Sequence, residues 1–286
     1  MVFDCFTFFN ELDILEIRMN ILDKEVDKFV LVEATRTHQG KEKPLYFNEN
    51  KSRYAAFADK IIHIIVDEFP VDESNSSWTL ERYQRDKIMD GLKEAKKGDT
   101  ILVSDVDEIP NPEQIKAYKN TPGIKVFKQQ SFFYFLNCRN ITYNKDYEWC
   151  GTVMAKYSSK LSPQLLRFIS IYVAGAQVKR ILPKLYCNYR ILLWKIMLGK
   201  NIYAITNGGW HFSFLGGVQM IIRKVEAFAH AEYNKEEFKD PAKIEKALDE
   251  GRDIFGRDLK YKFTPLDNTF PEYILLNKEK YKNLIR

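Results

Sequence analysis

Short apolar runs typical of buried strands alternate with longer amphipathic segments over the first 110 residues. The strand-like runs are residues 2–9 (VFDCFTFF), 27–34, 60–69 and 100–103. Helices are predicted between them, from about Glu11 to Leu22 and from Ser76 or Ser77 to about Lys96. Because the strands are spaced by helices, the pattern predicts an α/β fold with a mostly parallel central sheet flanked by helices.

The pattern after residue 110 is less regular, although several elements are still indicated. A short helix is predicted over residues 112–120, and two apolar runs, IKVFKQQ and SFFYFLNC, are typical of strands that could form a hairpin. A Trp-His-Phe strand at 210–212 lies between two glycine pairs, and an amphipathic helix follows Gly217. One more helix and an irregular tail are expected at the end of the chain.

Residues 165–205 mix long apolar runs with basic side chains. No run there reaches the roughly 18 uninterrupted apolar residues that a membrane-spanning helix needs. Two interpretations stay open. We favour a helical insertion packed on the domain; the alternative is a basic amphipathic element that contacts a membrane surface through about residues 169–200.

The composition is that of an ordinary soluble globular protein, with 45% hydrophobic and 29% charged residues. The net charge of +5 is too mild and dispersed to indicate a nucleic-acid partner, but it suits a polyanionic small ligand or an anionic membrane surface. The four cysteines show no CxxC pair, and no signal-peptide pattern precedes the first strand. We therefore expect reduced thiols and a location in the cytoplasm or at the inner membrane surface.

An acidic cluster follows the strand-like run at 100–103. Asp105, Asp107 and Glu108 would repel one another at a strand end unless positive charge offsets them, from either basic side chains or a divalent cation. Ligands of open α/β sheets bind at the carboxyl ends of the strands, which favours the cation. Asp105 and Asp107 project to the same side of an extended segment, and their oxygens suit Mg2+ or Mn2+ bridged to a diphosphate. Glu108 points the other way and is expected to be a structural partner.

Four further side chains are candidates for ligand binding. His211, between glycine pairs, could complete the metal site as a neutral imidazole, although a lone histidine is more often a core residue. Arg85, in the helical segment LERYQRDK, could meet phosphate oxygens, and Gln84 a base or ribose. Glu33, at the end of its strand, could do the same as Gln84. The structural alternative for the helix segment is a solvated face.

Glu148 and Asp146 are candidates for a general base. Both lie in KDYEWCG, beside Trp149, which could form an aromatic platform for a sugar ring. Transfer to a sugar hydroxyl with inversion requires a carboxylate that is not bound to metal and can reach the hydroxyl. Taken singly, either residue is more often an ordinary surface acid.

Several long stretches, in order along the chain, resemble glycosyltransferase family 17. They include FDCFTFFNELDILEIRMN, KIIHIIVDEFP, ERYQRD, ILVSDVDEIP and NGGWHFSFLGGVQMIIRKVEAFAHAEYN. The resemblance implies a GT-A type fold, inversion at the anomeric carbon, a glycan acceptor and a UDP-sugar donor, expected to be UDP-N-acetylglucosamine. Asp105 and Asp107 match the family's DxD, which implies ribose or water-mediated metal contact for Asp105 and direct ligation of Mn2+ or Mg2+ for Asp107.

We accordingly expect one domain over residues 1–286. Residues 1–110 would form the nucleotide-binding half and 111–260 the acceptor-binding half, with the basic apolar insertion at 165–205. Two other functions stay open: a non-catalytic protein that binds glycans or a membrane surface, and a DxD phosphohydrolase. The second is disfavoured because Ile109 stands where such enzymes generally have Thr or Val.

Overall fold

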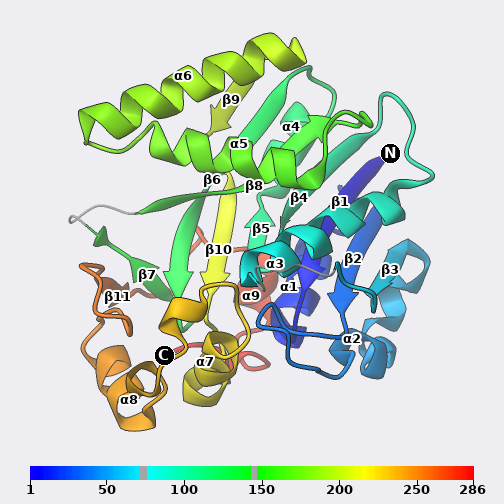
Figure 1. Ribbon diagram of the computed structural model, residues 1–286. Coiled ribbons are helices and arrows are strands. Elements are labelled where there is room, and N and C mark those ends of the chain that lie inside the picture. The colour runs from blue at the N-terminus through cyan, green and yellow to red at the C-terminus, as the bar shows by residue number, and fades with distance from the viewer. Residues whose placement is uncertain (71–75, 143–146) are drawn as a thin grey trace.

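The computed structural model describes residues 1–70, 76–142 and 147–286 and has an α/β fold built on one curled, mixed sheet (Figure 1). Its strands are β1 (Val2–Phe8), β2 (Lys28–Ala34), β3 (Ile61–Val66), β4 (Thr100–Asp105), β5 (Glu108–Pro110), β6 (Ile124–Phe133), β7 (Cys138–Asn140), β8 (Glu148–Lys156), β9 (Ile202–Ile205), β10 (Gly209–Ser213) and β11 (Tyr261–Phe263). Its α-helices are α1 (Leu12–Leu22), α2 (Tyr46–Glu49), α3 (Ser77–Asp86), α4 (Pro112–Tyr118), α5 (Pro163–Gly175), α6 (Ile181–Leu198), α7 (Gly217–Val225), α8 (Pro241–Asp249) and α9 (Glu272–Leu276). The α/β class predicted from the sequence is confirmed.

The N-terminal half of the sheet is parallel, as predicted. Its strands run in the order β3, β2, β1, β4, and β1 pairs in parallel with both β2 and β4. Strand alternation sends Phe6 and Phe8 of β1 into the apolar cluster under α1, whereas Phe3 and Cys5 join the cluster on the opposite face. Helices therefore cover both faces of this half, and its polar groups collect at the strand ends.

The rest of the sheet is only partly parallel, which corrects the expectation of a mostly parallel sheet. β8 pairs antiparallel with β4 and β6, and β7 pairs antiparallel with β6, whereas β9 and β10 run parallel to β6. The connection from β6 to β7 is too short for the crossover that parallel neighbours need, and β8 returns along the other side of β6 in the same direction as β7. The expected pair of strands at 124–138 is one long strand, β6, followed by the short β7.

Strand β5 forms within the segment expected to be a turn. It pairs antiparallel with β10, so that His211 lies opposite Glu108. The glycine pair before Trp210 makes this possible, because Gly209 adopts φ +126° and a Cβ there would lie 2.2 Å from the Ile109 carbonyl oxygen. The close approach that these glycines permit is thus to backbone. It brings β10 to residues 105–108, between β4 and β5, which we call the acidic turn.

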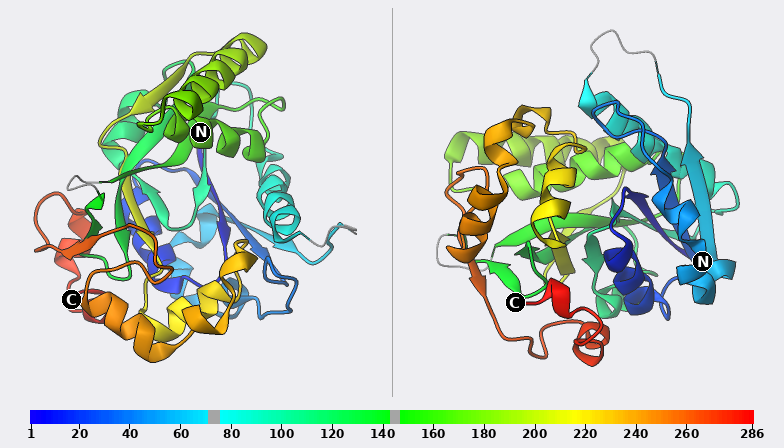
Figure 2. Two further views of the ribbon diagram at one scale, coloured as in Figure 1. Left: turned by 60° about the vertical axis from the view of Figure 1, so that its left-hand side comes forward. Right: turned by 90° about the horizontal axis from the view of Figure 1, so that it is seen from below.

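The insertion at 165–205 is a helical hairpin, α5 and α6, packed on the sheet beside β8 (Figure 2). Helix α5 buries Leu166, Ile169 and Val173, whereas α6 contains no fully buried residue. The packed insertion that we favoured is therefore present. No helix in the described ranges is long and apolar enough to cross a membrane.

A fully buried ion pair lies beneath the acidic turn. Arg18 of α1 donates to both carboxylate oxygens of Asp4 in β1, at 2.6 and 2.8 Å, and both side chains are 0% exposed. The same guanidinium donates to the carbonyl oxygens of Asp105, Val106 and Glu108 at 2.9–3.1 Å. Sequence reasoning placed both charged residues inside apolar patterns without assigning them a role.

Replacing Arg18 with methionine should destabilise the protein by about 3–5 kcal/mol, because Asp4 and the turn carbonyls would be buried without a partner. Urea unfolding at pH 7 measures this change. Arg53→Met is the matched control, since Arg53 pairs with Asp13 and Glu16 at the surface and should contribute at most about 1 kcal/mol. The double variant Asp4→Asn, Arg18→Met should recover part of the loss; equal losses for Arg18→Met and Arg53→Met would contradict this interpretation.

Candidate active site

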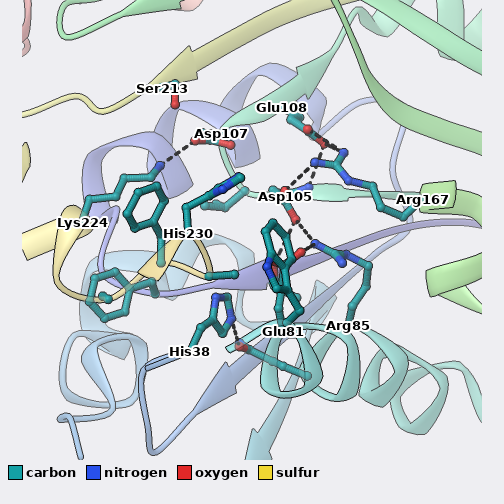
Figure 3. A pocket seen from close by; sticks show the side chains of 18 of the residues that line it. His38, Glu81, Arg85, Asp105, Asp107, Glu108, Arg167, Ser213, Lys224 and His230 are labelled. Carbon is teal, nitrogen blue, oxygen red and sulfur yellow. Dashed lines mark hydrogen bonds and ion pairs between the residues drawn. The ribbon is translucent and has the colours of Figure 1, made fainter. Parts of the chain in front are cut away.

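A cavity of about 610 Å³ opens at the carboxyl ends of β1 and β4. Its wall includes the ends of both strands, the acidic turn, and side chains from α3, α5, β10 and α7 (Figure 3). Thr7 and Asp105 end their strands there, as the rule for parallel sheets predicts. The cavity thus gathers residues from Thr7 to Arg257, which are far apart in the chain.

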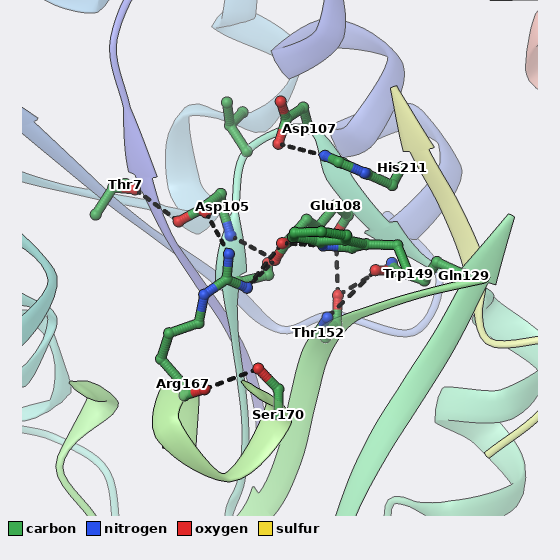
Figure 4. Close-up of polar contacts among 12 residues, drawn as sticks. Thr7, Asp105, Asp107, Glu108, Gln129, Trp149, Thr152, Arg167, Ser170 and His211 are labelled. Atoms are coloured by element: carbon green, nitrogen blue, oxygen red, sulfur yellow. Dashed lines mark hydrogen bonds and ion pairs between the residues drawn. The ribbon is translucent and has the colours of Figure 1, made fainter. Parts of the chain in front are cut away.

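Asp105 is held by two arginines. Its carboxylate accepts hydrogen bonds from Arg85 at 3.1 Å (Figure 3), and from Arg167 at 2.9 Å and the Thr7 hydroxyl at 3.3 Å (Figure 4). Burial alone would raise the pKa of Asp105, but the charges of Arg167 and Arg85 outweigh it and hold the pKa well below its ordinary value. Asp105 is therefore ionised and fixed in direction.

Glu108 is a structural partner, as expected, and it is 1% exposed. It accepts from Arg167 at 2.7 and 3.0 Å, from the Trp149 indole at 2.6 Å, and from the backbone N–H of Asp105 at 3.0 Å. Arg167 consequently bridges two of the three carboxylates. The same contacts set the plane of Trp149, which stacks on His211 with ring centroids 4.8 Å apart.

Asp107 and His211 face each other across the deepest part of the acidic turn. Asp107 Oδ1 lies 3.8 Å from His211 Nε2, and Asp107 Oδ2 accepts from Lys224 at 2.9 Å. Burial lowers the pKa of His211 further than Asp107 raises it, so the imidazole is neutral at pH 7. Burial would also lower the pKa of Lys224, but Asp107 and Glu11 raise it above its ordinary value, so the ammonium keeps its charge.

This pair fits a divalent cation that shares its shell with a ligand. A carboxylate oxygen and a neutral imidazole nitrogen are acceptable donors to Mn2+ or Mg2+, and such ions usually take one or two protein ligands plus phosphate oxygens and water. No group of three or more His, Cys, Asp or Glu side chains that could hold a metal occurs in the part of the chain that the structure describes. The protein could therefore supply only part of the coordination shell here.

The other residues predicted for donor binding lie in different positions. Gln84 lines the cavity, but its amide donates to the Val32 carbonyl at 3.0 Å and its oxygen contacts His38 at 2.9 Å. Arg85 lines the cavity and is 2% exposed, with both terminal nitrogens engaged by protein oxygens. Glu33 is not at the cavity; it is fully buried and accepts from the backbone N–H of Phe47 at the start of α2.

Of the two predicted bases, the structure describes only Glu148, and it does not bring this residue to the cavity wall. Glu148 forms an ion pair with Lys128 across β8 and β6 and does not line the cavity. Its neighbours Trp149 and Cys150 do line the cavity. Asp146 lies outside the described residues.

A model of glycosyltransferase family 17 matches residues 1–162, more than half of the chain. The chain belongs to glycosyltransferase family 17. It is 29% identical over 120 residues to the β-1,4-mannosyl-glycoprotein 4-β-N-acetylglucosaminyltransferase of Homo sapiens, and equally to that of Rattus norvegicus; the match covers 40% of this chain and 22% of either relative. The matched part thus spans about a fifth of the length of these curated relatives.

Solved structures include a mannosyltransferase from Pyrobaculum calidifontis in complex with GDP-Man and Mn2+. It aligns with 89% of this family 17 chain and 66% of its own chain, at 11% identity and a TM-score of 0.37. At that score, the similarity supports no inference about ligands.

Part of the family 17 site lies beyond the matched region. Asp105, Asp107 and Arg85 fall within residues 1–162, whereas Arg167, His211 and Lys224 do not. Sequence reasoning missed Arg167 and Lys224 as site residues. A signal was present for Arg167, because residues 149–225 contain no acidic residue and this cation could pair only with a carboxylate distant in the chain.

The charge of Asp105 should make stability depend on pH in a specific direction. Because its pKa is lower in the folded than in the unfolded protein, Asp105 stabilises the fold above about pH 4, and this contribution is lost as the pH falls. Asp105→Asn should cost about 1–3 kcal/mol at pH 7, and its difference from the unmodified protein should shrink below about pH 4. Urea titrations from pH 7 to pH 3 test this.

Asp13→Asn provides a control for that titration, since the Asp13 side chain is 50% exposed in its pair with Arg53. It should change stability by at most about 1 kcal/mol at any pH. A loss for Asp105→Asn that stays constant from pH 7 to pH 3 would show that charge is not the origin.

Proposed function

We propose that this family 17 chain is a metal-dependent inverting glycosyltransferase that moves N-acetylglucosamine from UDP-N-acetylglucosamine to a hydroxyl of a glycan acceptor. The observation that carries the proposal is the convergence of Asp105 and Asp107, at and just after the end of β4, with His211 and three basic side chains in one cavity. Family membership supports glycosyl transfer, and the names of the curated relatives support the choice of sugar.

Asp107 and His211 would hold Mn2+ or Mg2+. When bound, the ion would offset the charge that develops on the UDP leaving group. Lys224, 2.9 Å from Asp107 and 3.6 Å from Glu11, would keep the Asp107 carboxylate oriented. The Lys224 ammonium is suited to a phosphate oxygen, and its positive charge is already in place before the UDP-sugar binds.

Arg85 and Arg167 would act through Asp105 and not through direct contact with the diphosphate. The terminal nitrogens of Arg85 donate hydrogen bonds to Gln164, Glu81 and Asp105. With two guanidiniums and Thr7 on the carboxylate, Asp105 presents a fixed acceptor for a ribose hydroxyl or a water molecule. We therefore treat both arginines as positioning residues.

Aromatic side chains from the C-terminal half would bind the sugars. Trp149, Phe214 and Phe228 line the cavity, and Trp149 is fixed by its hydrogen bond to Glu108. Aromatic faces are suited to the apolar faces of sugar rings. This arrangement supports the assignment of residues 1–110 to nucleotide binding and of 111–260 to the acceptor.

UDP should stabilise the protein against unfolding only when Mn2+ or Mg2+ is present. At about 100 times the dissociation constant, the expected gain is roughly 2.7 kcal/mol, measured by thermal shift. Asp107→Ala should abolish the metal-dependent part and lower release of UDP from UDP-N-acetylglucosamine, whereas Glu279→Ala, at an exposed position, should change neither. Full activity of Asp107→Ala, or of the unmodified protein in EDTA, would contradict the proposal.

Glu148 and Asp146 remain the proposed general bases. Glu148→Gln and Asp146→Asn should be compared for turnover with an acceptor, and loss of the true base should lower kcat by about 10²–10⁴-fold without changing UDP binding. Glu148 would have to leave its pair with Lys128 to act. If both variants keep full turnover, the assignment is wrong, and Glu81, a carboxylate that does line the cavity, is the next residue to replace.

A further inference from the structure

Helix α6 packs on the protein along one side, where Tyr186 and Arg190 also contact Tyr172 of α5. Ile191, Trp194 and Leu198 contact the apolar cluster shared by the sheet and α5, and Cys187 packs against Gly175 of α5. These positions recur every three or four residues, so they form one face of the helix. The rest of α6 lies along the outer edge of the molecule, where no other element of the described residues covers it (Figures 1 and 2).

The opposite face of α6 is also apolar, and it is exposed. We call it the outer stripe; it consists of Leu182 (79% exposed), Leu185 (60%), Tyr189 (57%), Leu192 (54%) and Ile196 (69%). At about 100° per residue, these positions centre roughly 180° from the packed stripe. Ile181, Tyr186 and Met197, which are 53–74% exposed, widen the apolar surface. A contiguous exposed patch of this kind marks an interaction surface and not an ordinary helix face.

The charge around the outer stripe has one sign. Residues 149–225 contain no aspartate or glutamate. The basic residues of α6 and its flanks are Lys179, Arg180, Lys184, Arg190, Lys195 and Lys200. Within the described ranges, Lys184, Lys195 and Lys200 form no ion pair, and Lys200 shares a surface hollow with Lys97 and Lys156. The partner must therefore offer both apolar contact and negative charge.

We propose that α6 binds the surface of an anionic membrane and lies in the plane of its interface. The outer stripe would enter the boundary between headgroups and acyl chains, and the flanking lysines would contact lipid phosphates. Tyr186 and Tyr189 are of the side-chain type that prefers this depth. A second copy of the chain is a poorer occupant, because two outer stripes in contact would bring two sets of lysines together. The inference does not rest on the proposed enzymatic activity.

Vesicle flotation tests the proposal with phosphatidylcholine vesicles and with vesicles in which about a third of the lipid is phosphatidylglycerol. The unmodified protein should float with the anionic vesicles, more weakly at high salt and at least tenfold more weakly with phosphatidylcholine alone. The double variant Leu185→Glu, Ile196→Glu should bind anionic vesicles at least tenfold more weakly than the unmodified protein. Leu276→Glu is the matched control, because Leu276 is 76% exposed on α9, and it should bind like the unmodified protein.

Two further measurements separate the possible outcomes. All substitutions are at exposed positions, so the melting temperatures should stay within a few degrees of the unmodified protein. Tyr189→Trp should show a blue-shifted emission on addition of anionic vesicles. Absence of flotation, or equal flotation of Leu185→Glu, Ile196→Glu and the unmodified protein, would overturn the proposal. A dimer of the unmodified protein would also overturn it, if light scattering showed that the double variant is monomeric and neither protein bound vesicles.

Discussion

The acidic turn of this protein depends on one buried guanidinium. Arg18 donates to three carbonyl oxygens of the turn and to Asp4 and Ser104, which occupies the donors that an arginine side chain has. Because both ion-pair partners are fully buried, water cannot replace either one. With its carbonyls directed down at Arg18, the turn presents Asp105 and Asp107 to the cavity.

Above the turn, the charges are balanced by side chains from elements before and after it in the chain. Arg85 comes from α3, Arg167 from α5 and Lys224 from α7, and each contacts a carboxylate of the turn. Basic side chains thus offset Asp105 and Glu108, while Asp107 also faces a neutral His211. Basic side chains therefore contact all three carboxylates, and the proposed cation would share Asp107 with Lys224 and His211.

The sequence predicted the elements whose periodicity is local, including β1, β2, α1, β10 and α7. It also contained two charges in apolar patterns, Asp4 and Arg18, whose pairing follows from the cost of burying either alone. It could not predict that β5 would form and pair with β10, because that contact joins residues about a hundred positions apart. Glu33 and Glu148 lie away from the cavity for a similar reason. Their partners, Phe47 and Lys128, are brought to them by tertiary packing, which local periodicity does not predict.

Helix α5 connects the site with the outer surface of the hairpin. One side of it carries Arg167, which bridges Asp105 and Glu108, and the other side provides the seat for α6. Ile171 and Ala174 of the same helix line the cavity. Because a helix is stiff over this length and α6 packs directly on it, the cavity wall and the outer stripe keep a fixed distance and tilt. Whatever binds the outer stripe is thereby held in a defined orientation to the acidic turn, without a flexible linker between them.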